Sequence, residues 1–98
     1  MYVLVTHDIA DPEGFARAED QAEADIEANG WPEGITDCPI TLYNPARTFE
    51  VCLFEADSIP TVRQFVESIL GPPLSENSYV EIVAETVPSQ IGDMRQEA

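Results

Sequence analysis

Apolar residues recur along the chain with two different spacings, and these spacings divide it into six segments of regular structure. Four segments are rich in β-branched and aromatic residues and have the length of β-strands: residues 2–9, 35–43, 48–56 and 78–87. In two others the apolar residues recur every three or four positions, as on one face of a helix: residues 12–29 and 59–70. The pattern therefore predicts two helices among four strands.

Capping residues fix the ends of both predicted helices. Asp11 precedes Pro12, so an N-cap carboxylate is followed by a residue whose φ suits the first helical turn. Gly30 follows the last periodic residue of this helix. Ser58 caps the second helix in the same way, and Gly71 with the prolines after it ends that helix.

The first helix has a narrow apolar face, which we expect to pack on the sheet. It consists of four residues at helical spacing: Phe15, Ala18, Ala22 and Ile26. Three of its acidic residues are assigned to a solvated face rather than to a metal site: Asp20, Glu23 and Glu27.

The order β-α-β-β-α-β within 98 residues predicts an α+β fold of the ferredoxin-like type. Right-handed crossovers place the strands at 2–9 and 48–56 in the centre of a four-stranded antiparallel sheet, with both helices on one face. Pro39 cannot donate a ladder hydrogen bond, so its strand is expected at an edge or with a bulge. We expect one domain over residues 1–87 and a polar C-terminal tail over residues 88–98.

The strand at 48–56 is apolar on both faces, although two helices can cover only one face of the sheet. Val51 and Leu53 have one parity, and Cys52 and Phe54 have the other. An apolar face left bare needs a partner, and a second copy packed sheet to sheet about a two-fold axis is the simplest one. The sequence thus predicts a homodimer.

Charge excludes several classes of partner. The chain carries 19 acidic and 4 basic residues, with a net charge of −15, and this argues against nucleic acids and anionic membranes. All four basic residues are arginine. A salt-adapted cytoplasm and an ordinary acidic bacterial protein both explain this composition. No segment has the apolar length of a membrane span, so a cytoplasmic location is expected. The two cysteines are expected to be buried thiols.

Three parts of the sequence carry a resemblance to a known group of proteins: His7 late in the first strand, and the runs 51–58 and 75–81. With them the chain resembles the dimeric α/β-barrel superfamily, which includes antibiotic-biosynthesis-type monooxygenases and muconolactone-isomerase-like enzymes. It is most similar to small bacterial and archaeal domains of that type, some of them linked to nickel binding. Those relatives are expected to offer several histidines. Because this chain has only His7, no metal and no cofactor are expected.

Strand alternation defines one candidate site. The aliphatic residues of the last strand are expected under the helices: Val80, Ile82 and Ala84. The opposite parity then points into the interior of the dimer barrel and carries the catalytic candidates His7, Tyr79 and Glu81. The candidate ligand-binding residues of the same interior are Val5, Glu50, Cys52 and Phe54.

Three functions remain open at this point. The first is binding of a small, largely apolar molecule in the barrel cavity. The second is a cofactor-free monooxygenase or isomerase in which His7 is the general base, oriented by Tyr79 and Glu81. The third is a purely structural or interaction module.

Overall fold

The computed structural model describes residues 1–83 and contains the six expected elements. Their bounds are β1 Tyr2–Ile9, α1 Pro12–Asn29, β2 Ile35–Tyr43, β3 Phe49–Ala56, α2 Ile59–Leu70 and β4 Ser75–Ile82. The predicted tail at 88–98 and the end of the predicted last strand at 84–87 lie outside the described residues.

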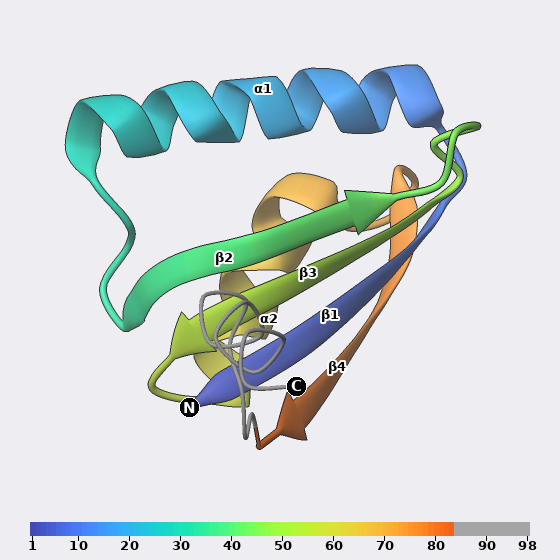
Figure 1. Ribbon diagram of the computed structural model, residues 1–98. Helices are drawn as coiled ribbons and strands as arrows, with labels where there is room; N and C mark the ends of the chain where they lie inside the picture. The colour runs from blue at the N-terminus through green and yellow to red at the C-terminus, as the bar shows by residue number, and fades with distance from the viewer. Residues whose placement is uncertain (84–98) are drawn as a thin grey trace, which may run out of the picture.

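The four strands form one antiparallel sheet in the order β2-β3-β1-β4, with the two helices packed against it (Figure 1). This is the ferredoxin-like arrangement, and it confirms the predicted fold class and the central position of β1 and β3. The pairing of β2 with β3 shifts register between Asp37 and Ile40, on either side of Pro39. Both the edge position and the irregularity predicted from Pro39 are therefore present.

The helix ends follow the capping residues. The Asp11 carboxylate accepts a hydrogen bond from the Gly14 backbone N–H at 3.0 Å, and the Ser58 hydroxyl accepts one from Thr61 at 3.3 Å. A Cβ on Gly14 would lie 2.4 Å from Asp11 Oδ2, so only glycine fits beside this cap. Both caps confirm the predicted helix starts.

α1 is long but loosely held. Of its 18 residues only Gly14 and Phe15 are buried, and the other members of the predicted apolar face are half-buried. α2 is packed more closely, because Val62, Val66 and Leu70 are all buried against the sheet. Space is therefore left between α1 and the sheet.

The core lies between the helices and one face of the sheet. Its sheet residues alternate along the two central strands: Val3, Val5 and Ile9 of β1, and Cys52, Phe54 and Ala56 of β3. On the helix side, Phe15 of α1 and the buried residues of α2 complete this core.

The prediction of which face the helices cover is wrong. The seven candidate site residues do share one face, since Val5 is paired with Cys52 and with Tyr79 in register. That face is the one under the helices, and Val80 instead lies on the opposite face with half of its surface exposed. The prediction failed because it was based on β4, an edge strand, where alternation marks two faces without showing which one is covered.

β4 also begins earlier than predicted, at Ser75 rather than at residue 78. The buried Ser75 hydroxyl donates to the carbonyl of Leu70, the last residue of α2, at 2.5 Å. This bond satisfies a carbonyl at the helix end and ties the start of β4 to α2. It also sets the parity of the strand, so that Asn77 and Tyr79 face the helix layer.

The face opposite the helices carries an apolar row that crosses all four strands. Ile40 is paired with Leu53, Leu53 with Leu4, and Leu4 with Val80. Leu42 continues the apolar surface and is 63% exposed. No helix of the described residues has the length and hydropathy needed to cross a membrane.

Candidate functional site

A pocket of about 310 Å³ lies between the helix layer and the sheet, in the space that α1 leaves open. Its walls are mainly apolar. Trp31, Phe54 and Phe65 form a cluster of edge-to-face rings, with centroids 6.2–6.3 Å apart. His7 from β1 and Glu19 from α1 are among the polar residues that line it. This pocket lies under the helices of a single chain, on the face opposite to the one where the pocket of a dimer barrel was predicted.

His7 is the most enclosed polar residue of this site, with no exposed surface. It is paired with Glu50 of β3 on one side and with Asn77 of β4 on the other. Its ring meets the edge of Phe15 from α1, at a centroid distance of 5.2 Å. The prediction that Glu50 neighbours His7 is confirmed, whereas the predicted neighbour on β4, Tyr79, is replaced by Asn77.

Asn77 holds the His7 ring in one orientation. Its Nδ2 donates to Glu67 Oε2 at 2.7 Å and to the Leu70 carbonyl at 3.2 Å, which leaves Oδ1 as an acceptor. Oδ1 lies 2.6 Å from His7 Nδ1. Nδ1 must therefore carry the proton, and Nε2 of the neutral ring has a free lone pair.

His7 Nε2 has no hydrogen-bond partner among the described residues, and it is buried. Burial lowers the pKa of His7 below its usual value, although Asn77 and the nearby Glu50 oppose this shift. The residue is thus a neutral imidazole with an unpaired basic nitrogen beside the pocket.

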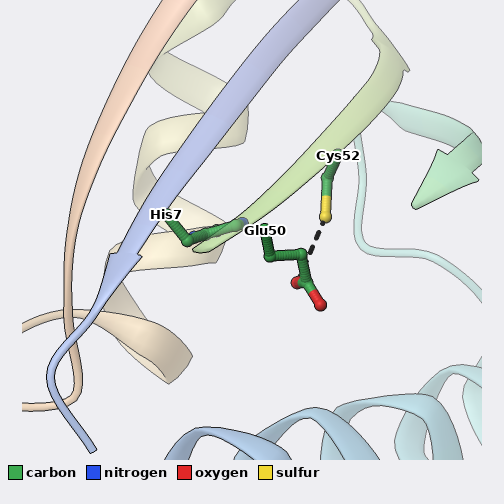
Figure 2. A group of neighbouring side chains, drawn as sticks. All are labelled: His7, Glu50 and Cys52. Carbon is green, nitrogen blue, oxygen red and sulfur yellow. Dashed lines mark hydrogen bonds between the residues drawn. The ribbon is translucent and has the colours of Figure 1, made fainter. Parts of the chain in front are cut away.

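Glu50 and Cys52 of β3 lie on the same face as His7. Glu50 is 1% exposed and Cys52 is 6% exposed. The Cys52 thiol donates to Glu50 Oε2 at 3.5 Å, and Figure 2 shows the carboxylate extending from β3 toward α1. One potential ligand atom from each of His7, Glu50 and Cys52 lies within 4.8 Å of the other two.

A second thiol borders this group. Cys38 of β2 also lines the pocket, and its Sγ lies 3.6 Å from the Thr41 hydroxyl, which in turn donates to Cys52 Sγ. The interaction with Cys38, together with burial, raises the pKa of the Cys52 thiol. Both cysteines are free thiols, as predicted, but only Cys52 is buried, whereas Cys38 is half-buried.

Glu19, like Asn77, is a site residue that sequence analysis missed. It faces the pocket from α1, and burial together with a hydrogen bond to Glu50 raises its pKa to about 9. The Glu19 carboxyl group therefore holds its proton more tightly than an exposed one. A signal was present in the sequence, because Glu19 follows Phe15 by four residues and so shares its helix face.

Tyr79 and Glu81 do not reach His7. The Tyr79 hydroxyl donates to Glu67 Oε2 of α2 at 2.5 Å, which raises the pKa of Tyr79 in addition to the effect of burial. Glu81 is exposed and is paired with Val3 near the far end of β1. Of the ligand-binding candidates, Cys52 and Phe54 line the pocket, Glu50 lies beside it, and Val5 is buried in the core.

Comparison with protein-family models found no match for this chain, and a search of curated proteins found no similar sequence. The link to nickel binding that the resemblance implied gains no support from these comparisons.

Proposed function

We propose that the protein binds a small, largely apolar molecule in the pocket between α1, α2 and the sheet. The observation that carries this proposal is a cavity of about 310 Å³ with an aromatic wall and a few buried polar groups on one side. Small-molecule sites in proteins have this composition, and their volumes begin at roughly 300 Å³.

The polar groups indicate which part of the ligand they would hold. His7 Nε2, which has no partner among the described residues, supplies an acceptor, and the Glu19 carboxyl group also lines the pocket. The aromatic rings at the other wall favour a flat or cyclic apolar body. A compact apolar molecule with one or two oxygen atoms at one end matches both walls.

Binding can be measured through Trp31, which is the chain's one tryptophan and lines the pocket. A neutral naphthylamine probe is suitable, since the charge of −15 disfavours anionic dyes. We expect the probe to quench Trp31, and Ala22→Phe, which fills the pocket from α1, to abolish the effect.

Ala24→Phe is the matched control, because Ala24 lies on the exposed side of the same helix. It should leave probe binding unchanged. Equal binding by the wild type and Ala22→Phe would contradict the proposal. Native mass spectrometry of the purified protein would detect a retained ligand.

We also propose that the chain forms a homodimer through the face opposite the helices. Support comes from the apolar row of Ile40, Leu53, Leu4 and Val80, which crosses the whole sheet on that face. Burial of such a face in an obligate dimer removes roughly 2,000 Å² or more from water. A second copy is the simplest occupant of this face, because the same apolar row can pack against itself about a two-fold axis.

Light scattering tests the dimer. We expect a dimer for the wild type and a monomer for Val80→Glu, because this substitution places a charge at the β4 end of the apolar row. Ala24→Glu adds the same charge on the outer side of α1 and should leave the dimer intact. A wild-type monomer at micromolar concentration would contradict this proposal.

In the catalytic hypothesis His7 remains the general base, and Asn77 replaces Tyr79 and Glu81 as the residue that positions it. Its support is the tautomer that Asn77 selects, which leaves Nε2 free to accept a proton. This role of His7 stays a prediction.

A further inference from the structure

Three side chains with different metal-ligating atoms meet beside the pocket. His7 offers an imidazole nitrogen, Glu50 a carboxylate oxygen and Cys52 a sulfur, and these atoms lie within 4.8 Å of one another (Figure 2). All three residues are more than nine-tenths buried. His7 and Glu50 are paired across the two central strands, and Cys52 follows Glu50 by two residues on the same face of β3.

Two of these groups are costly to bury as they stand. His7 Nε2 has no partner among the described residues, and an unsatisfied buried polar atom destabilises the fold. The Glu50 side chain is 1% exposed, and the hydrogen bond that it accepts from the Cys52 thiol brings no positive charge to it. Buried carboxylates are normally paired with a cation or bound to a metal ion. A single cation at this point would satisfy both groups.

Asn77 supplies the support that a metal-binding histidine requires. Histidine ligands donate their second ring N–H to a fixed acceptor, which orients the ring and leaves the other nitrogen for the metal. Asn77 Oδ1 is such an acceptor for His7, and Asn77 is itself held by the end of α2. This support distinguishes the cluster from an accidental meeting of acidic side chains.

We propose that His7 Nε2, the Glu50 carboxylate and Cys52 Sγ bind one divalent d-block cation of the zinc type. Nitrogen, oxygen and sulfur ligands together suit Zn²⁺, which takes four ligands in a tetrahedron, and they do not suit Mg²⁺ or Ca²⁺. On binding, the Cys52 S–H bond breaks, the sulfur keeps the electron pair for the metal, and the proton leaves to solvent. The fourth position faces the pocket, where Glu19 or a pocket ligand can occupy it.

The test uses the full chain and Zn²⁺ itself. Zn²⁺ binding is measured by competition against a chromophoric chelator. Excess Mg²⁺ saturates the exposed carboxylates, and about 0.5 M salt screens their charge. Under these conditions we expect one Zn²⁺ per chain. Cys52→Ser and Glu50→Gln should each weaken Zn²⁺ binding by more than about 100-fold. Asn77→Ala should weaken it by about 10–100-fold, as expected for a positioning residue.

A matched control lies nearby in the structure. Glu55→Gln removes a carboxylate of β3 that points to the opposite face. This variant should retain wild-type Zn²⁺ affinity. Equal losses in the control and in the ligand variants would overturn the proposal, as would a wild type that binds no Zn²⁺ under these conditions.

A measurement on the wild type alone keeps the test independent of variant folding. Co²⁺ bound at the site should show the intense near-ultraviolet absorption of a cobalt–thiolate bond and the visible bands of tetrahedral Co²⁺. Bound Co²⁺ without thiolate absorption would overturn the proposal. The same result would leave the Nε2 lone pair available for the general-base role, which a metal bound at Nε2 would exclude. Neither outcome depends on binding of the apolar probe.

Discussion

Phe15 is the side chain on which α1, and with it one wall of the pocket, depends. It is 2% exposed, and Gly14 is the one other buried residue of this helix. Its ring fills the space between α1 and β1, and it meets His7 edge-on. Replacing Phe15 by alanine therefore removes the main apolar contact between α1 and the sheet.

The expected loss can be estimated from burial. Truncation of a buried phenylalanine to alanine costs about 3–5 kcal/mol, whereas the folding free energy of a small domain is about 5–15 kcal/mol. With an m-value of about 2 kcal/mol/M, the midpoint of urea unfolding should fall by about 2 M. The more conservative Phe15→Leu keeps most of the volume and should cost less than about 1.5 kcal/mol.

Urea unfolding followed by circular dichroism measures both variants. Trp31 fluorescence reports separately on the pocket, where its ring packs against Phe54 and Phe65. A loss below about 1 kcal/mol for Phe15→Ala would refute this reasoning. It would show that the half-buried alanines and Ile26 hold α1 without its single buried ring.

Three further predictions concern stability. Tyr79→Phe removes the hydrogen bond to Glu67 and should lower the free energy of unfolding by about 1 kcal/mol near neutral pH. Thermal unfolding at a series of pH values measures this difference. Because the pKa of Glu67 is lowered and that of Tyr79 is raised, the difference in stability between the wild type and the variant should shrink below about pH 4.5 and above about pH 10. A difference that stays constant with pH would contradict this prediction. Ser75→Ala should lower the free energy of unfolding by about 0.5–1.5 kcal/mol in chemical denaturation, because the Leu70 carbonyl loses one of its two donors and keeps only Asn77. No change would show that water replaces the lost hydroxyl. The melting temperature measured by calorimetry should rise between 0.01 M and 1 M potassium chloride. At the lower concentration the Debye length is about 30 Å, so the acidic side chains that give the net charge of −15 repel one another across the molecule. A melting temperature that stays flat or falls would count against this prediction.

Local sequence signals determined the elements, their ends and their order. Asp11 and Ser58 cap the two helices because their side chains accept from free N–H groups of the first turn, which needs no tertiary contact. Pro39 marked an edge strand, since a missing N–H excludes the middle of a sheet. Given that order, handedness and short connections were sufficient to place β1 beside β3 and to bring His7 opposite Glu50.

Only the tertiary structure decided which face of the sheet the helices cover and what surrounds His7. Both parities of the central strands are apolar, so alternation correctly grouped His7 with Val5 but could not show on which side they lie. The choice is made by long-range contacts, such as Phe15 against His7 and Ser75 against the end of α2. For the same reason Asn77 and Glu19 were not predicted, because each acquires its role from a partner that is distant in sequence.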